Sequence, residues 1–527
     1  MRNLKAILLG SAAFACIGIA SETAHAQSYA FGAGATFPQI VYRELFDCAF
    51  DQLQGGGTGP GPRAKALACS SFNQAGIHGL MVYAPTGSGN GKASLLSNLP
   101  STIGTPGTTI PFTDTTIGVS SAANYDGIQF AGSDDVVNPA DVANWAAGGS
   151  SSNQTKFGNL IQIPALIGVV GIGFNGKDGA GNPLTILPAT PSVTVPGSST
   201  PLPGSSGLNL SRTAVCGIFS GHITQWDNAV LTKLNTATPG GVGTTPYGHG
   251  NITVVHRQDG SGTTFLLSNA LATQCQFEFG ANSESDPTIV SYAFPWTDHA
   301  AAACPFPVAH GANQLNWPDQ FSVDQCTPSH TVTNPGGGHF SNASGTGALV
   351  SLVASTNGAI GYASADFWLP VKTTGLATAN IQSQWDVTLG TNKFQPPTWY
   401  GGQVAMDSVT PVFDDTTRPN PLAWSLQGVV PNAGVKDAYP ISGFTWIEMY
   451  QCYQVHANGN NPLHELLTSL NFMYGSSSTG YPIENANGFA NVPYRWLVEI
   501  YTLLNHPTYG PNYAGTGSCA GTTPGAY

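Results

Sequence analysis

A short run of residues in the middle of the chain combines side chains that bind oxyanions. It is RQDGSGTTF, residues 257–265. An apolar segment of β-type residues, 252–255, precedes it, and apolar residues recur at helical spacing through 265–271. The pattern therefore predicts a strand, a glycine turn and a helix.

The beginning of that helix would suit an anion. The first N–H groups of a helix have no partner within the helix and lie at the positive end of its dipole, so Ser261, Gly262 and Thr263 would form an anion cradle. Arg257 would add a planar, permanently charged fork that matches a tetrahedral oxyanion. For this stretch alone, the alternative is an N-capped surface helix with a solvated arginine.

Two further glycine turns open predicted helices nearer the N-terminus. In GAGATFP, residues 32–38, Thr36 fits an N-cap ahead of a proline at an early helical position. TGSGNGK, residues 86–92, follows the β-type run 77–83. Neither carries a nucleotide signature, because Phe37 breaks GxGxxG and the second turn lacks the P-loop spacing and hydroxyl. Three such turns favour a small anion held by several helix ends.

A further acidic candidate follows a predicted short strand at 128–131. Asp134 and Asp135 come directly after this strand, in the sequence GSDD. On local evidence alone, the alternative is turn chemistry before a helix that begins at Asn138 and Pro139.

The N-terminal 26 residues predict an exported protein. Arg2 and Lys5 precede an apolar segment, 6–20, and Ala24-His25-Ala26 forms a small-residue cleavage site, as in a secretory signal peptide cleaved after Ala26. Cys16 is a poor lipid-attachment site because the residues before it lack the expected leucine. No later apolar run is long and pure enough to span a bilayer. We therefore expect a periplasmic or secreted protein without stable membrane insertion.

The cysteine content agrees with export. Of nine cysteines only Cys16 lies in the predicted leader, and the even number that remains favours disulfides. Other connectivities stay open, but proximity in the sequence suggests four pairs: Cys48 with Cys69, Cys216 with Cys275, Cys304 with Cys326, and Cys452 with Cys519. The chain has no CxxC, no paired Cys/His spacing and no lone cysteine, so we expect neither a structural zinc site nor a thiol nucleophile. We expect no other metal site and no cofactor.

The overall composition excludes some partners. The formal net charge is −12 without basic clusters, which argues against nucleic acid and anionic membranes as ligands. Charged residues make up only 8%, against about 25% in ordinary domains. With 65 glycines and 38 prolines, we expect a loop-rich surface.

The order of predicted elements indicates an α/β architecture. Strands alternate with helices along most of the chain, and in such folds ligands lie beyond the carboxyl ends of strands. The segment 161–174 is apolar and glycine-rich, and predicts a buried strand pair or a crossover between lobes. The length allows two or three domains.

Eight motifs, taken in order, resemble the periplasmic phosphate-binding proteins of phosphate ABC transporters. They are GAGATF (32–37), TGSGNG (86–91), FAGSD (130–134), IGVVGIGFN (167–175), IFSGHITQW (218–226), RQDGSGTTF (257–265), GAIGYA (358–363) and YPISGFTW (439–446). The first motif and RxDGSGT are the most specific. The resemblance implies a two-lobed type II periplasmic binding protein-like fold with mixed sheets and the ligand in the cleft. Lobe I would comprise 27–165 and, with the tail, 438–527, and lobe II would comprise 166–437.

The resemblance also implies a phosphate receptor without catalytic residues, a monomer that would deliver its ligand to an ABC transporter permease. Asp259 would orient Arg257 by ion pairing. The implied phosphate contacts are Thr36, Phe37, Ser88, Asp134, Arg257, Ser261, Gly262 and Thr263.

The chemistry of phosphate supports that assignment from the residues themselves. Phosphate near neutral pH keeps a proton and sulfate does not, so a buried Asp134 carboxylate could accept a hydrogen bond from phosphate while repelling sulfate. A site built around one such bond rejects the analogue that lacks it by roughly 10⁴-fold.

The chain is longer than typical members of that family, and other functions remain open. The additional residues lie in loops at 55–66, 100–118, 176–211 and 303–340 and in the tail after 505. The alternatives are a secreted phosphatase or phosphoester-binding protein, a binder of another oxyanion such as sulfate, and an extracellular scavenging or adhesive protein. A phosphatase would need a metal cluster or an activated nucleophile, and the HExxH match that starts at His464 fails at Thr468.

Overall fold

The computed structural model describes most of the chain after the predicted leader. The described residues are 28–50, 80–98, 128–149, 152–187, 205–221, 223–238, 240–278, 317, 338–368, 376–390, 393–455, 461–475, 480–521 and 525–526. The predicted signal peptide, the loops at 55–66 and 100–118, and most of the loop at 303–340 lie outside these ranges.

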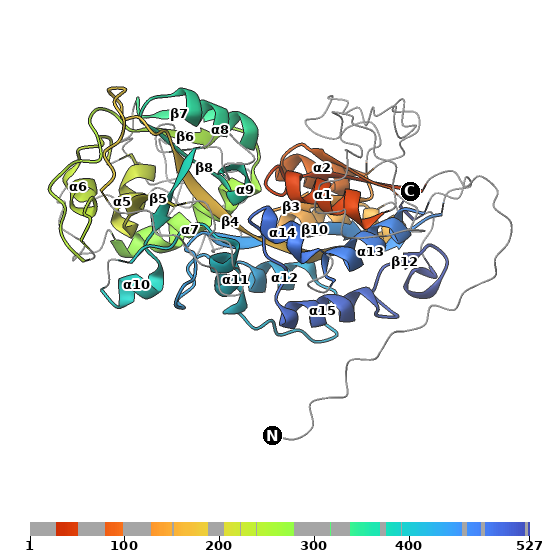
Figure 1. The fold of residues 1–527 in the computed structure, drawn as a ribbon. Coiled ribbons are helices and arrows are strands. Elements are labelled where there is room, and N and C mark those ends of the chain that lie inside the picture. The colour runs from red at the N-terminus through yellow and green to blue at the C-terminus, as the bar shows by residue number, and fades with distance from the viewer. Residues whose placement is uncertain are drawn as a thin grey trace, which may run out of the picture.

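A mixed sheet runs through the described structure (Figure 1). At its centre the strands β4 (Leu160–Phe174) and β10 (Ser442–Tyr450) are antiparallel neighbours. The first strand group, on the β10 side, consists of parallel strands β1 (Tyr29–Gly34), β2 (Leu80–Pro85) and β3 (Phe130–Ser133). The second strand group, on the β4 side, consists of parallel strands β6 (Thr253–Arg257), β7 (Phe340–Ala343) and β8 (Ala359–Ser364). A parallel pair, β5 (Ser205–Leu210) and β9 (Ala377–Ile381), joins β4 through β9.

Strand β4 connects the two groups. It has 15 residues, all buried, and pairs with β10 over its first part and with β8 and β9 over its last part. Of the two readings predicted for 161–174, the crossover is therefore observed, as one continuous strand. Its glycines have a packing role: a Cβ at Gly168 would lie 2.1 Å from the Phe37 ring, and one at Gly173 would lie 2.5 Å from the Trp368 ring.

Helices follow most strands, as the sequence predicts. In Figure 1, α1 and α2 lie beside the first strand group, and α8 lies beside the second. The helices are α1 (Gln39–Ala49), α2 (Ser88–Ser97), α3 (Pro139–Ala146), α4 (Asn153–Phe157), α5 (Arg212–Phe219), α6 (Ala229–Leu234), α7 (Gly262–Glu278), α8 (Thr346–Ser355), α9 (Ala365–Trp368), α10 (Gln384–Thr388), α11 (Trp399–Asp407), α12 (Pro421–Gly428), α13 (Pro462–Met473), α14 (Tyr481–Ala486) and α15 (Tyr494–Leu504).

One predicted helix start is wrong in detail. Helix α1 begins at Gln39 with Pro38 in the N-cap position and no side-chain capping bond. Thr36 is therefore not the N-cap. Its hydroxyl instead makes contacts with residues of the second strand group, which are described below.

Two of the four predicted disulfides are present. Cys216–Cys275 joins α5 to α7, and Cys452–Cys519 joins β11 (Cys452–Tyr453) to the C-terminal segment. Strand β11 also pairs in parallel with β12 (Asn512–Tyr513). The other two predicted pairs include Cys69, Cys304 and Cys326, which lie outside the described residues.

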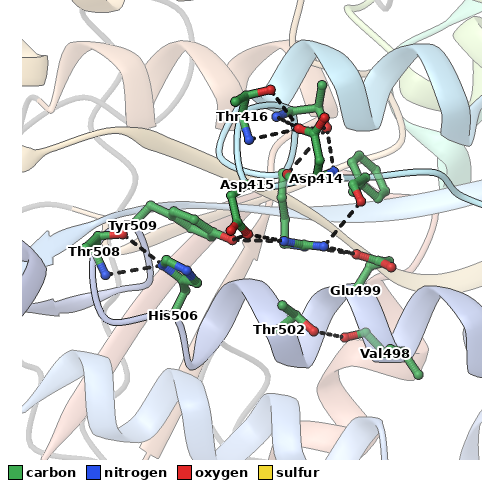
Figure 2. A network of polar contacts seen from close by, with 12 residues as sticks. Asp414, Asp415, Thr416, Val498, Glu499, Thr502, His506, Thr508 and Tyr509 are labelled. Atoms are coloured by element: carbon green, nitrogen blue, oxygen red, sulfur yellow. Dashed lines mark hydrogen bonds and ion pairs between the residues drawn. The ribbon is translucent and has the colours of Figure 1, made fainter.

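The buried Arg418 connects helix α15 and the C-terminal segment to the loop before α12, and Figure 2 shows its partners Asp415, Glu499 and Tyr509. The Arg418 guanidinium donates to Glu499 Oε2 of α15 at 2.9 Å, to Asp415 Oδ1 at 2.9 Å and to the Tyr509 hydroxyl at 3.0 Å. The Tyr509 ring stacks on His506, with ring centroids 3.5 Å apart. One side chain therefore holds a loop, a helix and the C-terminal segment together.

We expect Arg418→Leu to lower the free energy of unfolding by about 3 kcal/mol, because it leaves the largely buried Glu499 carboxylate without its partner. Chemical denaturation would measure the change. Arg495→Ala is the matched control: the exposed Arg495 donates a hydrogen bond to Thr410, so its loss should change the free energy of unfolding by no more than about 0.5 kcal/mol. Equal losses in the two variants would contradict a structural role for the Arg418 network.

Candidate anion-binding site

The structure places the predicted site residues where strands end and helices begin. Because the strands within each group are parallel, their carboxyl ends lie at the same edge of the sheet. Thr36 and Phe37 follow β1, Ser88 begins α2, Asp134 follows β3, Arg257 ends β6, Ser261 precedes α7, and Gly262 and Thr263 begin α7.

Ser88 joins the two strand groups directly. Its Oγ accepts hydrogen bonds from the Gly262 backbone N–H at 3.1 Å and from the Asp134 backbone N–H at 3.2 Å. The approach is so close that a Cβ at Gly262 would lie 2.5 Å from Ser88 Oγ and 2.5 Å from Asp134 Cβ. Glycine is therefore required at the first position of α7, and the beginnings of α2 and α7 face each other.

Arg257 is the buried cation at the place where the two strand groups meet. We call this place, around Ser88, Asp134, Arg257 and Gly262, the junction. It is 1% exposed, and its Nε donates to Asp259 Oδ1 at 2.6 Å while Nη2 donates to the other oxygen of the same carboxylate. The predicted ion pair is therefore present. Asp259 Oδ1 also accepts a hydrogen bond from the Gly345 backbone N–H at 2.9 Å. The turn before α8 therefore holds the Asp259 carboxylate in the position from which it binds Arg257.

Two residues in this network were missing from the sequence-based set. Thr346 Oγ1 lies 3.1 Å from Arg257 Nη1 and 2.8 Å from Thr36 Oγ1. The Tyr362 hydroxyl accepts the Arg257 backbone N–H at 3.0 Å and lies 2.7 Å from Thr264 Oγ1. A signal for Thr346 was available, since SGTG at 344–347 follows a strand and opens a helix as the other glycine turns do. Tyr362 lies in the GAIGYA motif, but nothing in its neighbouring residues indicated a contact with Arg257.

Phe37 has its side chain in the core. Its ring packs edge-on against Phe489, with centroids 5.4 Å apart, and its carbonyl accepts a hydrogen bond from Ser364 Oγ at 3.0 Å. Of the predicted contact residues, Phe37 could therefore serve a ligand only through its backbone N–H.

Two buried polar side chains at the junction have no hydrogen-bond partner within the described part of the structure. They are Asp134, through both carboxylate oxygens, and Thr263, through its hydroxyl. Each residue is 1% exposed. A buried polar group without a partner destabilises a protein by about 1–3 kcal/mol, so such groups need an explanation. A polar ligand between Asp134 and the beginning of α7 would supply the missing partners.

The environment of Asp134 favours the neutral acid. Burial raises the pKa of Asp134 to about 8, although the neighbouring Thr445 and Ser88 hydroxyls, which do not reach hydrogen-bonding geometry, and the positive charge of Arg257 oppose the rise. The neighbouring Asp135 has a buried cation of its own, because Lys92 Nζ lies 2.7 Å from Asp135 Oδ2 and 3.1 Å from Asp141 Oδ2. A single proton is therefore available at Asp134 when the junction is empty near neutral pH.

Two other kinds of site were also sought. Among the described residues, no cluster of three or more histidine, cysteine, aspartate or glutamate side chains is placed to hold a metal ion. In the described ranges, no helix is both long and apolar enough to cross a membrane.

Comparison with known proteins identifies the family and the fold. A family model described as a PBP superfamily domain matches residues 22–467. Alkaline phosphatase L of Pseudomonas aeruginosa PAO1 is 26% identical over 422 residues, which cover 80% of this chain and 81% of that protein. A phosphate-binding protein from an unknown prokaryotic organism is 24% identical over 84% of this chain and 93% of its own length.

Solved structures agree on the architecture. The periplasmic phosphate-binding protein PfluDING, solved with bound phosphate, superposes with a TM-score of 0.57 at 21% identity and covers 94% of this chain and 100% of its own. A phosphate-binding protein from Stenotrophomonas maltophilia gives a TM-score of 0.54 at 21% identity, with 94% and 98% covered. The predicted mixed α/β fold of the two-lobed type II class is confirmed.

The raised pKa of Asp134 predicts a pH dependence of stability in buffer free of phosphate and sulfate. A carboxyl whose pKa is raised on folding stabilises the fold fully below its unfolded pKa, near 4, and this contribution is lost as the pH rises through about 8. Asp134→Asn removes the titration. Between about pH 5 and pH 9 the wild type should therefore lose more thermal stability than the variant. If the melting temperatures of the wild type and Asp134→Asn change equally between about pH 5 and pH 9, the raised pKa of Asp134 is contradicted.

Proposed function

This chain belongs to the PBP superfamily, and from that premise we propose that it binds inorganic phosphate in the periplasm as the substrate-binding component of a phosphate ABC transporter. The observation that carries the proposal is the buried junction at which Arg257, the beginning of α7 and the unpartnered Asp134 carboxyl meet. The site is a binding site without catalysis.

The parts of the junction complement a tetrahedral oxyanion. The Thr263 N–H lies at the positive end of α7, next to the Gly262 N–H that already donates to Ser88 Oγ, and Thr263 contributes a hydroxyl without a partner in the described structure. Ser88 Oγ accepts two N–H groups, so its own hydrogen is left for an acceptor. Hydrogen bonds to a charged group net about 1.5–3 kcal/mol each. Several of them suffice for micromolar affinity, about −8 kcal/mol, after desolvation and closure.

Asp134 would select phosphate over sulfate. Monohydrogen phosphate has a hydroxyl that can donate a hydrogen bond to an ionised Asp134, so it still binds when the pH rises above the pKa of about 8. Sulfate has no hydrogen to donate and can only accept a hydrogen bond from the protonated Asp134 carboxyl. Its binding should therefore fail as that carboxyl ionises.

The delivery role has support from the sequence and the fold. The leader pattern at 1–26 indicates export.

The strand pairing supports the proposed division into two lobes. Strand β10, which lies in the range 438–527, pairs antiparallel with β3 of the first strand group. This pairing supports a lobe I built from 27–165 and 438–527 and a lobe II built from 166–437. We propose a monomer whose two lobes enclose phosphate and present it to a permease.

Calorimetric titration tests the binding role. Mature protein, unfolded and refolded to remove bound ligand and titrated at about pH 9, where Asp134 is ionised, should bind one phosphate with micromolar or tighter affinity and should ignore sulfate. Arg257→Ala should weaken phosphate binding about 100-fold or more, because it removes a buried charge. Asp134→Asn should reduce the discrimination between the two anions.

The exposed Arg495→Ala variant serves as the control and should bind phosphate like the wild type. A folded wild type that gives no heat with phosphate would refute the proposal.

A second function is suggested by the relative named alkaline phosphatase L. Against it, Thr36, Asp134 and Arg257 are all buried, so the organic group of an ester would have to be buried together with its phosphate. We therefore expect that p-nitrophenyl phosphate is not hydrolysed above the buffer rate and does not compete with phosphate. Hydrolysis that increases with protein concentration and disappears in Arg257→Ala would establish the phosphatase function instead.

A further inference from the structure

Two threonine hydroxyls meet where the two strand groups face each other. Thr36 follows β1 of the first group and Thr346 follows β7 of the second. Their Oγ1 atoms are 2.8 Å apart although the residues are separated by 310 positions in the sequence. Both side chains are buried. Arg257 Nη1 lies 3.2 Å from one hydroxyl oxygen and 3.1 Å from the other.

The hydrogens of this group can be counted. A guanidinium nitrogen of the Nη type carries two hydrogens and accepts none, so Arg257 Nη1 donates one to each threonine oxygen. The two hydroxyls have one hydrogen each, and the contact between them uses one. One hydroxyl hydrogen therefore remains. No acceptor for it is found among the described residues, and an oxyanion beside Arg257 would provide one.

The surrounding contacts fix Thr346 in place. It is the first residue of α8, whose N-cap is Gly345 with φ +80°, and its hydroxyl contacts Thr36 and Arg257. The Gly345 N–H is bound to Asp259, which also holds Arg257. The Arg257–Asp259 ion pair therefore holds the beginning of α8, and with it the Thr346 hydroxyl, in place.

We propose that Thr346 is a positioning residue for phosphate. Its hydroxyl donates to Thr36 Oγ1, which directs the remaining hydrogen of Thr36 at the ligand, and the same bond holds the two strand groups together around it. Thr346 therefore acts through Thr36 and slows ligand release. This inference rests on the proposed phosphate-binding function.

Thr346→Val tests the idea because it keeps the shape of the side chain and removes the hydroxyl. We expect the Kd for phosphate to rise about tenfold, the value of one hydrogen bond, and most of the change to lie in the dissociation rate measured by stopped flow. Thr346→Ser keeps the hydroxyl and should restore binding to within about twofold of the wild type. Ser351→Ala, an exposed change on the same helix, is the control and should bind like the wild type.

A double-mutant cycle separates positioning from a structural role. If Thr346 acts through Thr36, then the pair Thr36→Val and Thr346→Val together should weaken binding no more than Thr36→Val alone. If the rise in Kd of the double variant equals the product of the rises in the two single variants, the proposal is overturned. A Thr346→Val variant that binds phosphate within twofold of the wild type would also overturn it. Melting curves without phosphate show that each variant is folded.

The controls distinguish the two levels of inference. If the wild type does not bind phosphate, the proposed function fails. If the wild type binds and Arg257→Ala does not, but Thr346→Val binds normally, only the role of Thr346 fails.

Discussion

The burial of one guanidinium sets the conditions for the rest of the site. Arg257 is 1% exposed, and a buried charge is tolerated only when it is paired and hydrogen-bonded. Asp259 supplies the opposite charge, and the Thr36 and Thr346 hydroxyls accept from the remaining nitrogen. Because these partners come from both strand groups, the hydrogen bonds of the guanidinium are complete only when the two groups lie together.

The local charge balance explains how an anion could still be attracted. Arg257 and Asp259 cancel, Lys92 offsets one of the two charges of Asp135 and Asp141, and burial favours the neutral form of Asp134. No unpaired cation is therefore needed at the site, where the positive end of α7 and a set of oriented hydroxyl groups can face an anion. Such fixed dipoles attract an anion without exposing a surplus charge in the interior.

Close backbone approach is the second requirement of this architecture. Gly262 allows α7 to reach Ser88 and Asp134, and Gly87, with φ +93°, lies so near the Gly260 carbonyl that a Cβ would be 2.8 Å from it. Gly168 and Gly173 allow aromatic rings to cover β4. The same residue type thus shapes both the site and the strand that connects the two groups.

The sequence by itself determined the local units. The three glycine turns and the helices after them were predicted because each depends on residues that are neighbours in the chain, and the resemblance to phosphate-binding proteins implied the Arg257–Asp259 pair. The disulfide pairs Cys216–Cys275 and Cys452–Cys519 were inferred from the order of the cysteines along the sequence and are present, although their members lie 59 and 67 residues apart. Only the tertiary structure decided that 161–174 is a single strand, that Thr36 faces Arg257 instead of capping α1, and that Thr346 and Tyr362 join the network. These outcomes depend on how β6 aligns with β7 and β8 and how β4 aligns with β10. Such registers are set by contacts between residues far apart in the chain, which no local pattern records.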